Sequence, residues 1–186
     1  MLEGVGRRLG AGKDHLLDIA HHSLNGRERN LLWRNDGDGG FTDVAYVNAA
    51  DRIEDGRGVA VFDADGDGHL DLLLRNYRRP ALLLRNAGDA RHWVGFELEG
   101  KRSNRDAVGA RVRLRTGHRW QTRVVAAGSG YLSASSRRLH FGLGAAERVD
   151  EVEIAWPSGL RSHLRGLAAD RLHRISEEVE LAGAGS

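Results

Sequence analysis

The sequence predicts an all-β protein in two parts: partial β-propeller blades, followed by an antiparallel β-sandwich or small barrel. Three observations carry this prediction. No segment shows the hydrophobic period of a long helix, short apolar and alternating runs recur throughout, and the first half contains an internal repeat. The 186 residues include 25 glycines and only two prolines, which suits a chain with many tight turns.

Composition excludes several classes of protein. A hydrophobic content of 40% and a charged content of 29% are ordinary for a globular protein. No apolar run reaches the roughly 18 residues of a membrane helix, and the N-terminus lacks the apolar core of a signal peptide. Cysteine is absent, so disulfides, thiol catalysis and cysteine-bound zinc are excluded. The basic residues are scattered and the net charge is only +2, which argues against nucleic-acid binding.

The internal repeat has two anchors. Leu31–Asn35 recurs as Leu82–Asn86 at an offset of 51 residues, and Leu17–Ile19 recurs as Leu70–Leu72 at an offset of 53. Each unit consists of an acidic loop, a strand, a polar link and a second strand, which is the size of a propeller blade.

The number of repeats is small. A propeller closes with about four to eight blades, whereas this chain encodes fewer than two. We therefore expect the chain to be the C-terminal part of a longer protein, or a truncated product beginning at Met1. Its repeat half should expose apolar strand edges unless the second domain covers them, and exposed edges would offer a route to self-association.

The acidic loop of the later repeat lies within Val59–Leu74. This stretch contains four aspartates within nine residues. Carboxylates this close repel one another unless a cation lies among them, and calcium prefers such oxygen ligands. The spacing matches the start of an EF-hand loop, but Leu74 stands where that motif requires glutamate. We predict a short calcium loop between two strands; the alternative is a solvated acidic turn without an ion. The four carboxylates are those of Asp63, Asp65, Asp67 and Asp71.

Two other acidic segments are weaker candidates. In the earlier copy, Gly10 and Gly12 stand where carboxylates are needed and only Asp14 and Asp18 remain, so strong calcium binding is not expected there. Asp36 and Asp38 belong to an Asn-Asp-Gly segment that we interpret as a hairpin turn without a metal.

Gly58–Leu72 and Asn30–Val44 resemble the FG-GAP, or VCBS-type, repeats of integrin α-chain propellers and many bacterial surface proteins. The resemblance covers roughly residues 10–90. It implies that the four loop aspartates hold Ca²⁺, and that His69 adds its backbone carbonyl as a further ligand.

The second half shows a different β pattern. In Ala110–Arg115 the apolar side chains of Val112 and Leu114 alternate with arginines, and Thr116–His118 is a hairpin candidate. Trp156 is expected in the core. The predicted strands are His92–Leu98, Ala110–Arg115, Trp120–Ala126, Arg138–Leu143, Val149–Trp156 and Arg171–Ile175.

Four motifs of this half resemble the ASPIC/UnbV domain of secreted, cartilage-acidic-protein-like chains. The motifs are Ser103–Val112, Gly128–Ser133, Leu139–Gly144 and Val152–Gly159, with one departure at Ala134, where the family more often has glutamine. The resemblance implies an extracellular or periplasmic location. We predict FG-GAP repeats over residues 1–90, the ASPIC/UnbV domain over 91–180 and a disordered tail over 181–186.

No catalytic constellation is found. The Gly128–Gly130 segment lacks the full nucleophile elbow, and the pair His21 and His22 lacks the helical zinc motif. His140 alternates with apolar neighbours and is interpreted as structural. We therefore predict that the chain is not an enzyme.

Two polar surfaces remain as candidates for recognition. Ser103–Asp106 is either a recognition loop or a hydrogen-bonded structural turn. One strand carries three arginines, which form either a cationic stripe or a solvated outer face. The stripe would contain Arg111, Arg113 and Arg115, joined by Arg119 and Arg123 of the next strand.

The sequence therefore predicts a calcium-binding, non-catalytic extracellular module for adhesion or ligand binding, with a protein or glycan partner. One alternative is an accessory domain of an enzyme whose catalytic part lies elsewhere. Another is acidic-polysaccharide binding through the arginine-rich strand face.

Overall fold

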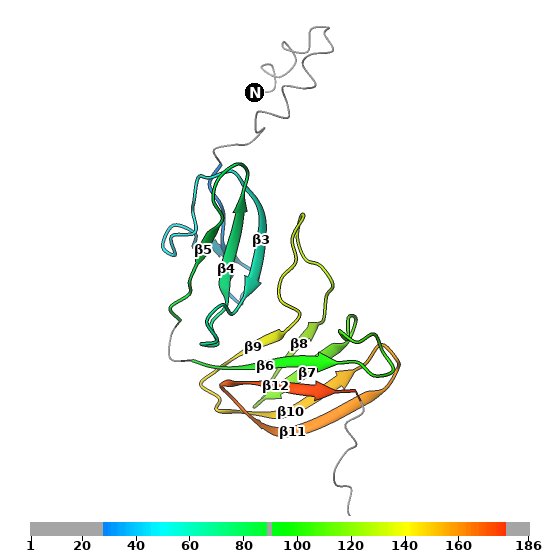
Figure 1. Ribbon diagram of the computed structural model, residues 1–186. Coiled ribbons are helices and arrows are strands. Elements are labelled where there is room, and N and C mark those ends of the chain that lie inside the picture. The colour runs from blue at the N-terminus through cyan, green and yellow to red at the C-terminus, as the bar shows by residue number, and fades with distance from the viewer. Residues whose placement is uncertain (1–27, 89–90, 178–186) are drawn as a thin grey trace, which may run out of the picture. The chain divides into compact units, whose positions relative to one another are not determined.

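The computed structural model describes residues 28–88 and 91–177 (Figure 1), and these residues form β-strands joined by turns and loops. The all-β prediction is confirmed. Across the described ranges, no helix is long and apolar enough to cross a membrane. The degraded loop at residues 10–18, the pair His21 and His22, and the predicted tail at 181–186 lie outside the described residues.

The chain divides into two compact units. The first takes its residues from Met1–Gly58 and Leu74–Leu82, and the second from Val59–Leu73 and Leu83–Ser186. The acidic loop is therefore part of the same unit as the second half of the chain. The domain boundary near residue 90 stays a prediction.

A short hairpin lies in the first unit. Strands β1 (Trp33–Asn35) and β2 (Phe41–Asp43) pair antiparallel, as the turn chemistry between them predicts. The Asn35 side chain accepts a hydrogen bond from the Gly37 N–H at 2.8 Å, and the Asp38 carboxylate accepts one from the Gly40 N–H at 2.8 Å. The Asp36 carboxylate accepts from the Thr42 hydroxyl at 2.7 Å, so both acidic residues of this turn have a local structural role.

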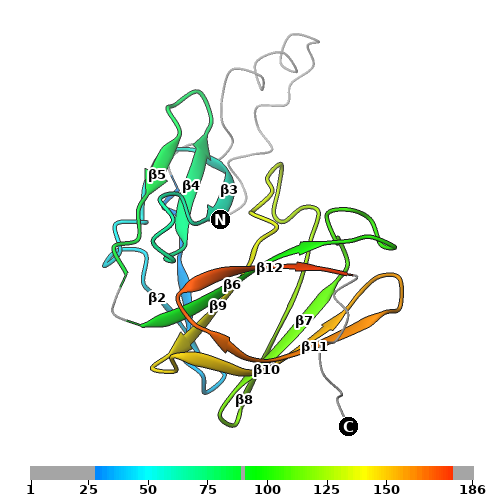
Figure 2. The same ribbon diagram turned by 60° about the horizontal axis from the view of Figure 1, so that its bottom comes forward.

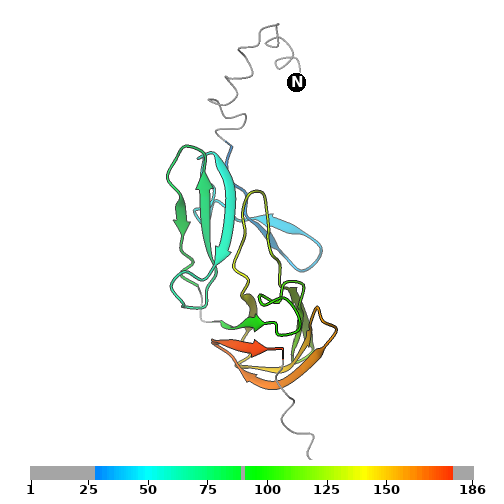
Figure 3. The same cartoon turned by 45° about the vertical axis from the view of Figure 1, so that its right-hand side comes forward.

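Three strands form a sheet in the order β3-β4-β5, and they lie side by side in Figures 1 and 3. They are β3 (Gly56–Phe62), β4 (Asp71–Asn76) and β5 (Leu82–Leu84). The acidic loop joins β3 to β4, so the predicted arrangement of a loop between two strands is observed.

The remaining strands form a two-sheet sandwich (Figure 2). One sheet has the order β11-β10-β7-β8 and the other the order β12-β6-β9. The strands are β6 (His92–Glu99), β7 (Arg111–Thr116), β8 (Arg119–Val124), β9 (Leu139–Gly144), β10 (Arg148–Ala155), β11 (Arg161–Ala168) and β12 (Arg171–Ser176).

The core lies between these two sheets. Val112 and Leu114 are fully buried, as their alternation with arginine predicts, and they face Phe96 and Phe141 of the same cluster. The two phenylalanine rings meet edge to face at 5.8 Å. Trp156 is 3% exposed, and its indole N–H donates to the Ser162 hydroxyl at 2.9 Å.

Two features of the sandwich were not predicted. Strand β11 was missed because its large apolar residues, Leu164 and Leu167, are three positions apart and hide the period of two. It is an edge strand that pairs with β10 alone. In addition, β12 pairs parallel to β6, whereas the β10–β11, β10–β7, β6–β9 and β7–β8 pairs are antiparallel.

Candidate metal centre

The loop between β3 and β4 is shaped by hydrogen bonds to its own carboxylates. The two oxygens of Asp63 accept from the N–H groups of Gly66 at 2.7 Å and Gly68 at 3.0 Å. Both glycines have positive φ, 78° and 89°, a conformation that side chains rarely adopt. The sequence thus folds the loop back over Asp63.

Asp71 fixes the far end of the loop. It is the first residue of β4 and is 1% exposed. Its carboxylate accepts hydrogen bonds from the Ala64 N–H at 2.9 Å and from the Asn86 N–H at 2.8 Å. A buried carboxylate is costly unless it is hydrogen-bonded or paired, and these two donors stabilise it.

Three of the predicted ligands converge. Oxygen atoms of Asp63, Asp65 and Asp71 all lie within 4.8 Å of one another. Calcium–oxygen distances of 2.3–2.6 Å place two ligands on opposite sides of one ion about 4.6–5.2 Å apart. The donor set therefore fits a hard divalent cation such as Ca²⁺.

Asp67 is not in this group of side chains, and the ligand predicted from His69 is its backbone carbonyl rather than its ring. The Asp67 carboxylate accepts from the His69 N–H at 2.8 Å, and this bond, together with the charges of His69 and Arg85, lowers the pKa of Asp67. The His69 ring lies against the backbone of Gly88, where a Cβ would meet it at 2.1 Å.

Arg85 is a counter-ion that the sequence reasoning missed. Its guanidinium lies 2.6 Å from Asp65 and 3.6 Å from Asp67, and it is 67% exposed. The signal was present, because Arg85 and Asn86 form the Arg-Asn pair that ends each repeated strand. These two residues bring the end of the repeat back to the acidic loop of that repeat.

The loop also contacts β6 and β9. The His140 ring donates through Nε2 to the Gly68 carbonyl at 2.7 Å and stacks on Trp93 with ring centroids 5.5 Å apart. Burial lowers the pKa of His140, with the Gly68 bond acting in the opposite direction. His140 thus makes the structural contacts expected of it.

A second acidic group has its charge compensated. Oxygens of Glu151 and Glu153 and a ring nitrogen of His163 lie within 4.8 Å of one another. However, Glu151 pairs with Arg115 at 3.2 Å and Glu153 pairs with Arg113 at 3.6 Å. These two arginines compensate the negative charge of the glutamates.

The same ion pairs change the interpretation of the arginine stripe. Arg113 and Arg115 are neutralised by glutamates of β10, and Arg113 lies 3.9 Å above the Trp120 ring. The predicted extension to β8 was wrong. Arg123 is opposite Val112 and Arg119 is opposite Thr116, so both belong to the other face of the sheet.

The Ser103–Asp106 loop is a hydrogen-bonded structure. One Glu177 oxygen accepts from three consecutive backbone N–H groups, those of residues 101–103, each at 2.7 Å. The other oxygen accepts from the hydroxyls of Ser103, at 2.8 Å, and Ser158. Asn104 closes the loop by bonding both backbone groups of Val108. These contacts favour the structural alternative.

Comparisons with known proteins agree with this architecture. A family model described as an FG-GAP-like repeat matches residues 13–74, and one described as ASPIC and UnbV matches residues 100–182. Cartilage acidic protein 1 of Mus musculus is 34% identical over 142 residues, which is 72% of this chain and 22% of that protein. The Homo sapiens protein is also 34% identical over 142 residues, or 72% of this chain and 21% of its own length.

The Xenopus tropicalis protein of the same name is 36% identical over 121 residues, covering 61% of this chain and 18% of that protein. The chain thus spans about a fifth of the length of the curated relatives it matches. Both resemblances found in the sequence are confirmed. The chain carries an FG-GAP-like repeat followed by an ASPIC and UnbV domain, and it is homologous to cartilage acidic protein 1.

Proposed function

We propose that the chain is a calcium-binding, non-catalytic module for extracellular adhesion or ligand binding. The observation that carries the proposal is the convergence of Asp63, Asp65 and Asp71 within 4.8 Å. Asp67 and the His69 carbonyl complete the proposed ligand set. Bound Ca²⁺ would supply positive charge that allows these oxygens to lie together.

The role proposed for the ion is structural. Asp63 and Asp71 hold loop backbone on both sides of the site, and Asn86 connects the loop to the end of the repeat. An ion shared by these side chains would stabilise the folded blade, because the unfolded chain offers no assembled site. Recognition of a partner then belongs to other surfaces.

The non-catalytic and extracellular parts of the proposal rest on similarity. The chain is homologous to cartilage acidic protein 1, and the sequence offers no nucleophile with a positioned base. We propose residues 1–90 and 91–180 as the two domains, and a protein or glycan as the partner.

Thermal unfolding with and without calcium tests the ion. Addition of Ca²⁺ to the EDTA-treated chain should raise Tm, since a ligand that binds only the folded state stabilises it by mass action. Asp65→Ala should abolish most of this increase, because Asp65 is an exposed member of the converging carboxylate group. Asp38→Ala is the matched control, an aspartate of the separate β1–β2 turn, and should keep the full increase. A Tm that ignores calcium, or an Asp65→Ala variant that responds normally, would refute the site.

A further inference from the structure

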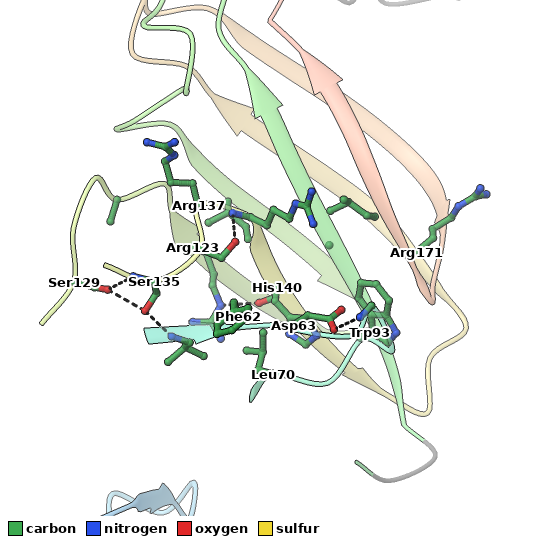
Figure 4. A pocket seen from close by; sticks show the side chains of 18 of the residues that line it. Phe62, Asp63, Leu70, Trp93, Arg123, Ser129, Ser135, Arg137, His140 and Arg171 are labelled. Carbon is green, nitrogen blue, oxygen red and sulfur yellow. Dashed lines mark hydrogen bonds between the residues drawn. The ribbon is translucent and has the colours of Figure 1, made fainter. Parts of the chain in front are cut away.

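A cavity of about 710 Å³ lies in the second unit, beside the acidic loop (Figure 4). Its walls come from the end of β3 and the acidic loop, and from β6, β8, β9 and β12 with the loop between β8 and β9. This volume is in the range of pockets that hold small molecules, about 300–1,000 Å³. It is too small for a folded partner domain.

The cavity has a largely apolar wall. The side chains of Phe62 and Leu70 come from the repeat, and those of Leu139 and Leu172 come from the sandwich. Leu139 is 6% exposed, and its side chain belongs to the sandwich core. This wall offers a surface for an aromatic or aliphatic body.

The serines of the wall are already engaged. Ser135 accepts from the Val61 N–H at 3.1 Å and exchanges hydrogen bonds with Ser129, while Ser136 accepts from the Arg138 N–H. A carbohydrate needs many free hydrogen-bonding partners, so this wall suits an apolar body better than a sugar.

The cavity is lined by more positive than negative side chains. Its four arginines outnumber its two aspartates, Asp63 and Asp170. Asp63 accepts two loop N–H groups, and Asp170 pairs with His92 at 2.6 Å. Both carboxylates therefore have partners of their own.

Two of the arginines also have carboxylate partners, and two do not. Arg137 pairs with Asp106 at 3.0 Å and Arg138 with Glu97 at 3.4 Å. Arg123 donates its Nε–H to the His140 carbonyl at 2.9 Å, and among the described residues its terminal nitrogens make no further hydrogen bond. Within the described ranges, neither Arg123 nor Arg171 forms an ion pair. Figure 4 shows Arg171 at the edge of the group of lining side chains, with its guanidinium directed away from them.

We propose that this cavity binds a small organic anion with an apolar body, a hydrophobic carboxylate. The apolar wall receives the body and Arg123 binds the carboxylate, a charge-assisted contact that guanidinium makes well. Arg171 adds positive charge at the rim. The inference rests on the ligand-binding part of the proposed function and not on ion binding.

Titration calorimetry on the full chain with 2-naphthoate as probe tests the cavity. Saturable binding is expected, while neutral 2-naphthalenemethanol should bind at least about tenfold more weakly, since it cannot make the charge-assisted hydrogen bonds that a carboxylate makes with Arg123. Arg123→Gln should weaken naphthoate binding by a similar factor. Arg111→Gln, an exposed arginine of β7 outside the cavity, is the matched control and should bind as the parent chain does.

A second measurement guards against misfolding of the Arg123 variant. The side-chain N–H signal of Trp93, which lines the cavity, should shift in NMR spectra of the unaltered chain as naphthoate is added. Absence of saturable binding, equal affinity for the neutral probe, or an unaffected Arg123→Gln variant that keeps its Tm would each overturn the proposal.

Repeating the titration in EDTA separates this inference from the calcium proposal. If naphthoate binding depends on charge but the Tm does not change with calcium, the proposed anion site in the cavity is supported and the proposed calcium site is refuted. If the Tm depends on calcium but naphthoate does not bind, the proposed anion site is refuted and the proposed calcium site is supported.

Discussion

At the scale of the residue, Gly68 is the most constrained position of the acidic loop. Its φ is 89°, and a Cβ built there would lie 1.9 Å from the indole nitrogen of Trp93. Its carbonyl also accepts the hydrogen bond of His140. Glycine is needed here both for the bend and for the close approach of the aromatic pair.

Alanine substitutions at Gly68 and Gly66 should separate the effect of the positive φ from the effect of the close contact with Trp93. Gly68→Ala adds a steric overlap, which costs roughly 1–3 kcal/mol in a packed site, to the backbone strain of positive φ. Gly66→Ala, with a φ of 78° and nothing within 4 Å of its Cβ, adds only the strain. Urea unfolding in EDTA should show the larger loss for Gly68→Ala. Equal losses would mean that the contact with Trp93 does not stabilise the fold.

At the scale of the element, Glu177 ties the end of β12 to the loop that follows β6. Burial of its carboxylate raises the pKa, but hydrogen bonds from the Ser103 N–H, the hydroxyls of Ser158 and Ser103, and the Lys101 N–H outweigh this effect. The resulting pKa is about 2, compared with an ordinary value of 4.5. The ionised form is therefore the form that the fold stabilises.

This shift predicts a pH dependence. Because the folded pKa is lower than the unfolded one, Glu177 stabilises the fold fully above pH 4.5, and this contribution is lost as the pH falls toward about 2. Glu177→Gln should lower Tm at pH 7 and flatten the decrease of Tm over that acidic window. Glu147→Gln, at an exposed position, should do neither. A Glu177→Gln chain with the parent's acid profile would contradict this role.

The arginine face shows how register decides what a strand presents. The two-residue connection between β7 and β8 places Thr116 opposite Arg119. Odd-numbered residues of β7 therefore share a face of the sheet with even-numbered residues of β8. Arg113 thus meets Trp120 on one face, while Arg123 turns to the other and reaches the His140 carbonyl. The predicted stripe is therefore divided between two faces of the sheet. Arg113 and Arg115 lie on one face, where glutamates compensate their charge, and Arg123 lies on the other.

At the scale of the whole molecule, the first unit exposes apolar side chains that a soluble surface seldom carries together. Trp33 is 57% exposed, Phe41 is 60% exposed and Tyr46 is 83% exposed. A propeller blade normally buries such residues against neighbouring blades. We propose that a second copy of the chain covers this apolar surface.

Light scattering coupled to size exclusion should detect the consequence. The average mass should rise with protein concentration, because contact between apolar surfaces removes them from water. Trp33→Ser together with Phe41→Ser should reduce this increase, while Arg111→Gln should leave it unchanged. A mass equal to one chain at every concentration would exclude self-association through this surface.

Local chemistry was enough to predict much of this protein. The strict alternation around Val112 placed β7 and its buried face, the Asn-Asp-Gly segment placed the β1–β2 turn, and the acidic spacing with two glycines predicted a loop between two strands. Each of these signals lies within a few residues of the element it specifies, so no distant contact was needed to read it.

Tertiary structure decided what depends on residues far apart in the chain. Contacts between segments distant in the chain decide that β12 pairs parallel to β6 and that Arg123 lies on the same face of the sheet as Val112. They also bring the Asn86 N–H to the Asp71 carboxylate. The cavity likewise combines Phe62 of the repeat with Arg123 and Leu172 of the sandwich. A sequence pattern records which side a residue takes on its own strand, but only folding selects the strand that faces it.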